Sequence, residues 1–267
     1  MKLKLEQCNM CSALRCVWPQ GMVHQPPVIE ENRFMIDFYY NAAPNPMKVA
    51  LLLEELGLAY TAHPVDTRKG DQFSPAFQSI NPNSKVPAIV DNGAVVFDSN
   101  AILLFLSEKY GQFAPKVSDA VQRAAMYSWL MFIATGVGPF SGQAVHFRHA
   151  APPNNDYALN RYDFEAHRHW GIVEKHLEQH RYFLGLDYSI VDMAFWGWAR
   201  MVPFVLGKDS AWLEFPQIKR LLDEINARDA AKRAEALKTQ HAFKAELDEE
   251  AKNFLFPQNL RLKGLNP

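Results

Sequence analysis

The stretch that decides the fold is NPNSKVPAIVDNGAVVFDSNAILLFLSEKYG, which spans residues 81–111. It contains two short apolar runs, 86–90 and 95–97, which are separated by Asn92-Gly93. We predict a β-hairpin here, because Asn and Gly tolerate the positive φ angles of a two-residue turn. An apolar helix follows directly, so the stretch predicts a loop, a strand, a turn, a strand and a helix in that order.

The start of this helix has the features of a ligand site. Asp98, Ser99 and Asn100 precede its apolar positions. The first backbone N–H groups of a helix have no partner within the helix, so they can bind a carboxylate while the neighbouring Asp98 holds an amine. Pro87, at the entry to the first strand, cannot donate a ladder hydrogen bond and marks a special turn. We expect a small zwitterion to bind here; the alternative is an ordinary hairpin and helix with a surface Asp-Ser cap.

The composition is that of a globular protein with a sizeable core. The 267 residues suit one large or two modest domains, and 48% of them are hydrophobic. The 28 basic and 29 acidic residues nearly cancel, so charge favours neither nucleic acid nor an anionic membrane as a partner. No apolar run approaches the roughly 18–20 residues that span a bilayer, and the first residues lack the apolar region of a secretory signal. We expect a cytoplasmic protein.

All three cysteines, Cys8, Cys11 and Cys16, lie near the start of the chain. Cys8 and Cys11 form a C-x-x-C pair, which suggests redox chemistry or half of a zinc site. The pair precedes any recognisable strand, however, and no second pair completes a zinc site. We therefore interpret residues 1–34 as an irregular extension with incidental cysteines. Thiol chemistry in the rest of the chain must then use a thiol from outside.

The periodicity predicts two domains of different class. An α/β domain covers residues 35–113 in the order βαβαββα, and its first two strands are expected to be parallel. An all-α domain covers residues 117–240, after a connector that contains the helix breaker Pro115, and a tail covers 241–267. Within the helical domain, Ser189 and Asp192 have the spacing of a capping box. The predicted helices are 47–56, 101–110, 118–145, 160–180, 189–206 and 215–227, with a short helical turn at 75–79.

The motifs of the α/β domain resemble those of the glutathione S-transferases, whose N-terminal domain is thioredoxin-like. In that family the Val-Pro step, here Val86-Pro87, contains a cis-proline, and the residue before it pairs with the cysteine of glutathione. The acid-Ser pair, here Asp98-Ser99, holds the γ-glutamyl end, although the family more often has Glu than Asp. The capping box belongs to the same family pattern. The resemblance implies glutathione as cosubstrate and a homodimer.

The turn before the first helix is expected to decide the mechanism. In this family the group that activates the glutathione sulfur lies there, near a helix N-terminus that lowers the pKa of a thiol. Residues 41–48 contain no Ser or Cys, and Tyr40 belongs to the preceding strand, so Asn45 is the candidate catalytic residue. Its alternative role is to satisfy the backbone of the turn. The pattern resembles the nu-class branch and its fungal prion-related cousins, in which Thr commonly stands where this chain has Ala43, and some members bind two glutathione molecules.

Three further residues correspond to family positions. Gln72 is predicted to contact the glycyl end of glutathione, with a solvated loop amide as the alternative. Lys85 is predicted to meet the glycyl carboxylate, unless it is an exposed lysine before a strand. Arg161 corresponds to an arginine that borders the active site in nu-class proteins; the alternative is an ordinary arginine on a helix surface.

We predict no metal site. His146 and His149 are spaced to share a helix face, but a site needs a third ligand and orienting partners. His167 and His169 point to different faces of a helix. A pocket wall or a packed helix surface is therefore expected. A set of aromatic residues is expected mostly in the core, with some at an apolar second-substrate pocket: Tyr127, Trp129, Phe132, Phe140, Trp196 and Trp198.

These patterns predict a glutathione transferase that uses the thiolate of bound glutathione to reduce a disulfide. Cleavage of an aryl ether or a haloaromatic compound uses the same thiolate on carbon, and the sequence does not separate the two acceptors. A glutathione-binding regulatory protein without turnover is the alternative from another class, since Ala43 removes a hydroxyl near the sulfur.

Overall fold

The structure is a computed structural model that describes residues 35–262 and residue 264. The predicted extension 1–34 and its three cysteines lie outside the described residues. The first part contains four strands and three α-helices, separated by short loops and one 3₁₀ turn, Asp71–Phe73. These elements are β1 (Ile36–Tyr40), α1 (Pro44–Glu55), β2 (Tyr60–Pro64), α2 (Pro75–Ile80), β3 (Ala88–Asp91), β4 (Ala94–Phe97) and α3 (Ser99–Tyr110).

The four strands form one mixed sheet in the order β2-β1-β3-β4. β1 and β2 are parallel, as predicted, and β3 is antiparallel to both β1 and β4. Alternate side chains of β1, from Ile36 to Tyr40, are buried in the main core with α1 and α3. The opposite face carries Tyr39, which packs with Phe77 of α2. This is the thioredoxin-like domain that the motifs predict.

The local signals of the hairpin are confirmed. Asn92 and Gly93 connect β3 to β4, and both have positive φ, at 51° and 82°. Gly57 follows the end of α1 with φ at 63°, as expected for the residue after a helix C-terminus.

The second part is helical, as predicted, but some helix boundaries differ. The predicted helix 118–145 is α4 (Ala120–Phe132) and α5 (Gly138–His149), joined by a π-helical turn at Ile133–Val137. The predicted helix 189–206 is broken near Arg200, because Pro203 cannot donate within a helix and instead begins a new one. The remaining helices are α6 (Asp156–Leu177), α7 (Ile190–Ala199), α8 (Val202–Leu206), α9 (Pro216–Asn226), α10 (Asp229–Gln240), α11 (Glu249–Leu255) and α12 (Gln258–Leu262).

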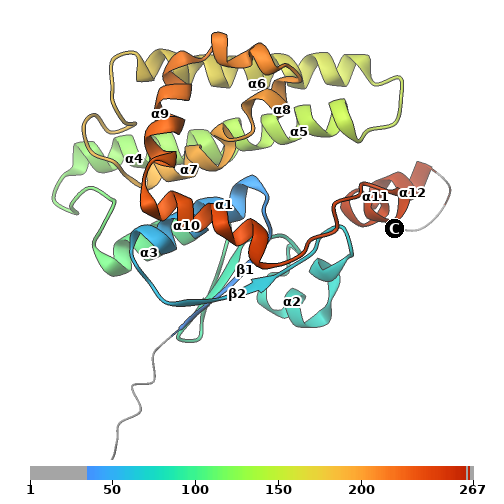
Figure 1. Cartoon of the computed structure of the whole chain (residues 1–267), viewed down its shortest axis with the longest axis horizontal. Coiled ribbons are helices and arrows are strands. Elements are labelled where there is room, and N and C mark those ends of the chain that lie inside the picture. Colours follow the sequence, from blue (N-terminus) through green and yellow to red (C-terminus); the bar gives the residue numbers. More distant parts are fainter. Residues whose placement is uncertain (1–34, 263, 265–267) are drawn as a thin grey trace, which may run out of the picture. The chain divides into compact units, whose positions relative to one another are not determined.

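The two parts share one hydrophobic core, with α1 at its centre. α1 contacts α3, α7 and α10, and Figure 1 shows these helices close to it. Residues of β1, α1, α7 and α10 belong to the same buried cluster. Among the described residues, no helix is long and apolar enough to cross a membrane.

The capping box fixes the start of α7 from inside the core. Asp192 is fully buried, and its carboxylate accepts hydrogen bonds from Ser189 N at 2.8 Å, Ser189 Oγ at 2.9 Å and Phe183 N at 2.9 Å. Burial raises the pKa of Asp192 to about 6, although these hydrogen bonds act in the opposite direction. One side chain therefore holds both the helix start and the loop before it.

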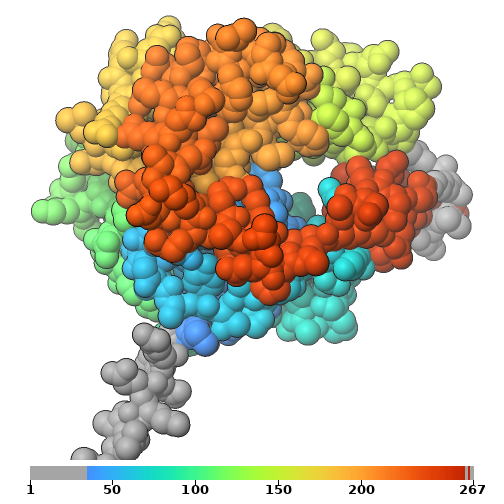
Figure 2. Space-filling view, viewed as in Figure 1, coloured from blue at the N-terminus to red at the C-terminus, as the bar shows by residue number. Residues whose placement is uncertain are grey.

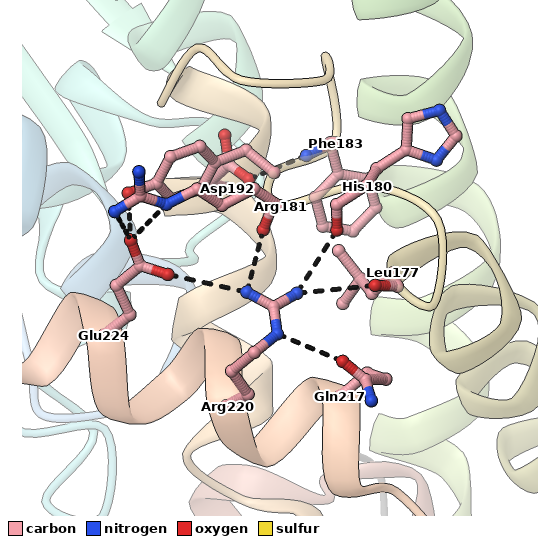
Figure 3. A network of polar contacts seen from close by, with 9 residues as sticks. Leu177, His180, Arg181, Phe183, Asp192, Gln217, Arg220 and Glu224 are labelled. Carbon is pink, nitrogen blue, oxygen red and sulfur yellow. Dashed lines mark hydrogen bonds and ion pairs between the residues drawn. The ribbon is translucent and has the colours of Figure 1, made fainter.

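Arg220 of α9 ties the same loop to the end of α6. Its guanidinium group donates to the carbonyl oxygens of Leu177, His180 and Arg181 at 3.2–3.4 Å (Figure 3). These carbonyls lie at or beyond the C-terminus of α6, where no further helical turn supplies donors. The arginine thus takes over the role of a C-terminal cap.

We predict that Asp192→Asn lowers the free energy of unfolding by about 2–4 kcal/mol, because the amide leaves a buried N–H group without an acceptor. Urea unfolding followed by circular dichroism measures this change. Asp187→Ala, an exposed acid in the same loop, is the matched control and is expected to cost less than about 0.5 kcal/mol. Equal losses in the two variants would contradict the role given to Asp192.

Candidate active site

The candidate site lies at one edge of the sheet, where the ends of its strands meet. Tyr39 pairs with Ala88, so Tyr40 lies opposite Pro87. Ala88 pairs with Phe97, so Pro87 lies opposite Asp98. The register therefore places the end of β1, the Val86-Pro87 step and the end of β4 in one row. The Val86-Pro87 bond is cis, as the family resemblance implies.

The start of α3 closes this row. Asp98 has φ at 74° and caps the helix: its Oδ1 accepts from Asn100 N at 2.9 Å and from Ala101 N at 3.1 Å. Both bonds use the same oxygen, and within residues 35–262 no donor engages Oδ2. Asp98 is exposed, whereas Ser99 is buried. The helix start thus presents one open carboxylate oxygen beside the Ser99 amide.

A buried lysine lies beneath Ser99. Lys48, in the second turn of α1, is 2% exposed, and its Nζ lies 3.5 Å from Ser99 Oγ. Burial lowers the pKa of Lys48 to about 7, and the charge of Asp98 acts against this shift. Burying a lysine ammonium group without a carboxylate partner costs free energy. A carboxylate bound at the start of α3 would offset this cost, so the position of Lys48 supports a carboxylate site there. Lys48 was not among the predicted site residues, because a single lysine in an amphipathic helix gives no signal in the sequence.

The first turn of α1 holds Asn45 as its second residue. The turn is shaped by Asn41, whose Oδ1 accepts from Ala43 N at 3.0 Å and whose Nδ2 donates to Thr67 Oγ1 at 3.2 Å. Tyr40 ends β1 and turns into the core, where its hydroxyl contacts Leu237 O and His241 Nδ1. Asn45 is therefore the amide side chain presented at this turn.

Asn45 is oriented from the helical domain. The indole Nε1 of Trp198, in α7, donates to Asn45 Oδ1 at 3.1 Å. A Cβ atom at Gly197 would lie 2.4 Å from the carbonyl oxygen of Pro44 and 2.6 Å from Lys48 Cγ. Only a glycine at this position lets α7 approach the start of α1 so closely.

A cavity of about 570 Å³ opens beside this turn. It is bounded by the turn, the loop after β2, α5, and the chain that follows α10, and Figure 2 shows the hollow between these parts. Its lining combines aromatic and cationic side chains, among them Trp198, Phe204, Phe243, Arg68, Lys238 and Lys244. Lys238 and Lys244 are paired with glutamate and aspartate residues, and Asp66 also lines the cavity, so the lining offers apolar surface with mixed charge.

The C-terminal segment, residues 241–262, forms one wall of the cavity. Lys244 N donates to Asp66 Oδ2 at 2.7 Å, and Arg68 donates to the carbonyl oxygens of Lys244 and Ala245. Farther along, the ring of Phe256 lies 4.5 Å from that of His146 on α5. The segment therefore joins the α/β domain to the helical domain. The phenylalanines of this segment, which was predicted to be a tail, are the sequence feature that indicates its packing.

The remaining predicted residues lie at different depths. Gln72 is buried, and its amide donates to Thr67 O at 3.2 Å and to Phe254 O at 3.4 Å, so it helps to hold the C-terminal segment. Lys85 is exposed, just before the cis bond. Arg161 is held by Glu165 on its own helix, at 2.7 Å, and does not line the cavity. The sheet edge thus gathers Asn45, Val86, Pro87, Asp98 and Ser99 but not Arg161.

The described residues contain no group of three or more side chains that could hold a metal ion. His169 is buried between Phe132 and Phe140, and His149 stacks on Phe204. Of the predicted aromatic set, Trp198 lines the cavity, Trp196 is fully buried, and Tyr127 is exposed.

Comparison with known proteins agrees with this geometry. Residues 42–109 match the glutathione S-transferase N-terminal domain, and residues 143–229 match the corresponding C-terminal domain. The disulfide-bond oxidoreductase YfcG of Escherichia coli (strain K12) is 38% identical over 214 residues, which cover 75% of this chain and 94% of YfcG.

Two solved structures extend the comparison. A glutathione transferase family member from Pseudomonas fluorescens, with two glutathione bound, is 35% identical, with a TM-score of 0.71 and coverage of 76% of this chain and 93% of that chain. A glutathione transferase from Pseudomonas putida, with one glutathione disulfide bound per subunit, is 33% identical, with a TM-score of 0.69 and coverage of 76% and 92%. The chain belongs to the glutathione S-transferase family.

Proposed function

We propose that this protein is a glutathione-dependent disulfide-bond oxidoreductase that works through the thiolate of bound glutathione. The observation that carries the proposal is the meeting of three features at one sheet edge: the cis Val86-Pro87 step, the open start of α3 at Asp98-Ser99, and Asn45 at the start of α1. YfcG has the same activity in its name, and the Pseudomonas structures hold glutathione or its disulfide.

Each end of glutathione has a proposed contact. The Ser99 amide and the positive end of α3 bind the γ-glutamyl carboxylate, and Asp98 Oδ2 accepts from its amine. Val86 pairs with the cysteinyl backbone beside Pro87. Lys85 and Gln72 are proposed for the glycyl end, next to the loop after β2. Arg161 stays a prediction that no described contact supports.

The reaction balances without a cysteine in the described part of the chain. The thiolate of bound glutathione attacks a disulfide, forms a new S–S bond and releases one thiolate of the acceptor, which takes up a proton. A second glutathione thiolate attacks the glutathione sulfur of the mixed disulfide and releases the other acceptor thiol. Two glutathione molecules are oxidised to glutathione disulfide, and one acceptor disulfide is reduced to two thiols.

Attack on an aromatic carbon is the second candidate, and the cavity lining favours it. Trp198, Phe204 and Phe243 provide apolar surface, and Arg68 can face a developing negative charge. The same thiolate then forms a thioether and displaces a halide or an aryl oxide.

The proposed chemistry has consequences for location and assembly. Reduced glutathione is maintained in the cytosol, so we infer a cytoplasmic enzyme.

We also infer a homodimer, because β4 is an edge strand whose Val95 and Phe97 are 47% and 42% exposed, and a second copy covers such apolar edges. Light scattering of the purified protein measures its mass.

We predict that a variant with all three cysteines changed to serine keeps disulfide reductase activity. Cys8, Cys11 and Cys16 all precede the described residues, and the proposed reaction passes between glutathione molecules. Reduction of 2-hydroxyethyl disulfide, coupled to glutathione reductase, measures the rate. A variant that keeps its circular dichroism spectrum but loses turnover would overturn this mechanism.

We predict that Lys48 makes the binding of S-methylglutathione depend on pH. The Lys48 ammonium group attracts the γ-glutamyl carboxylate, and the charged fraction falls as the pH rises through about 7. The dissociation constant should rise roughly fivefold to tenfold between pH 6.5 and 8. Titration calorimetry measures this change, and the thioether ligand excludes thiol ionisation.

Lys48→Met should bind more weakly at pH 6.5 and show little change up to pH 8. If histidines caused the pH dependence instead, it would persist in this variant, because they are unchanged. Lys175→Met, at an exposed position of α6 with no ion pair among the described residues, is the matched control and should behave like the wild type. A pH dependence that survives in Lys48→Met would refute the role of this lysine.

A further inference from the structure

Trp198 and Asn45 form the one direct side-chain hydrogen bond described between α7 and the first turn of α1, at 3.1 Å within residues 35–262. An indole N–H group donates and cannot accept. The atom that it contacts must therefore be the carbonyl oxygen of the Asn45 amide, and the NH₂ group must lie on the other side. This settles the orientation of an amide whose two ends are otherwise similar in shape.

The free end of Asn45 has no competing partner. Among the described residues, no acceptor engages its Nδ2. The side chain is partly buried at the second position of α1. Pro44 and Pro46 have no backbone N–H, and Met47 N donates to Ala43 O at 3.4 Å, so the N–H of Asn45 itself is the backbone donor left at this helix start. The Asn45 side chain therefore provides the second neutral donor of the turn, at the positive end of the helix dipole.

The indole itself is held tightly. A Cβ atom at Gly138 would lie 3.1 Å from Trp198 Nε1, and one at Gly142 would lie 3.6 Å from its Cη2. On the other side, Gly197 lets the backbone of α7 touch the start of α1. Trp198 is 9% exposed: one side of its ring packs on the glycines of α5, and the other side lines the cavity. Two glycines of α5 and one of α7 therefore determine where the indole N–H lies.

We infer that Trp198 is a positioning residue for the glutathione sulfur: its indole N–H fixes the Asn45 amide so that the NH₂ group donates to the bound thiolate. This inference rests on the proposed function. Without the indole, the amide rotates between two orientations, and in one of them its oxygen faces the thiolate and repels it. A hydrogen bond to a charged group is among the stronger ones, so its orientation matters.

The test measures the pKa of the thiol in bound glutathione from its thiolate absorbance. Trp198→Phe keeps an aromatic ring but removes the N–H group. We expect it to raise this pKa by about 0.5–1, which lowers the thiolate fraction roughly threefold to tenfold at pH values well below the pKa. Binding of S-methylglutathione, which has no ionisable thiol, should stay within about twofold of the wild type, and this shows that the site is folded.

Trp196→Phe is the matched control. Trp196 lies on the same helix, and its indole also donates to an asparagine, Asn226, at 2.8 Å, away from the proposed site. Its variant should leave the pKa of the bound thiol unchanged. A double-mutant cycle tests whether Trp198 acts through Asn45. In an Asn45→Ala background, Trp198→Phe should not change the pKa of the bound thiol any further.

Two outcomes would overturn the inference. One is an unchanged thiol pKa in Trp198→Phe with ligand binding intact; the other is an equal effect of Trp198→Phe with and without Asn45. If Trp198→Phe fails to fold, Gly138→Ala tests the same contact with the indole retained, because its Cβ would lie 3.1 Å from Trp198 Nε1 and displace the N–H group from Asn45. It should also raise the thiol pKa, and an unchanged pKa with S-methylglutathione binding intact refutes the inference. Failure of the proposed function is distinct, because the wild-type protein would then not lower the thiol pKa at all.

Discussion

The contact between the backbone of α7 and the first turn of α1 is the constraint on which the site depends. Any side chain at Gly197 would meet the carbonyl oxygen of Pro44 at 2.4 Å. With glycine there, the helices touch, Trp198 reaches Asn45, and the stem of Lys48 passes beneath the start of α3. The helical domain therefore contributes to the candidate active site through its packing. In the proposed reaction, the sulfur that forms covalent bonds belongs to glutathione.

The proposed mechanism divides the work between the two domains. The sheet edge holds the tripeptide through backbone groups, which Asp98 and Lys48 support electrostatically. The helical half orients Asn45 and, with the C-terminal segment, shapes the cavity for the acceptor. Catalysis then depends on donors that are already in place when charge develops on the sulfur. Because no cysteine follows Cys16, the described part of the protein binds and activates a thiol that it does not itself supply.

Local signals and family motifs predicted much of this arrangement, and long-range packing explains what they missed. Three features depend on residues that are close in the sequence, and the structure contains all of them: the Asn92-Gly93 turn, the cis bond before Pro87 and the capping box at Ser189. Lys48 and the C-terminal segment carry no such local pattern. Their roles arise when α3 covers the lysine and when Phe254 and Phe256 meet residues more than a hundred positions earlier. Arg161 corresponds to a motif position and is paired with Glu165 on its own helix, so its place beside the active site stays a prediction.

The most direct test of the central claim is a crystal structure of the wild-type protein with glutathione bound. We expect the sulfur to lie within hydrogen-bond distance of Asn45 Nδ2, with the γ-glutamyl carboxylate on the Ser99 amide and Trp198 still bonded to Asn45 Oδ1. A sulfur that faces another side chain, with Asn45 bonded only to the protein, would contradict the account.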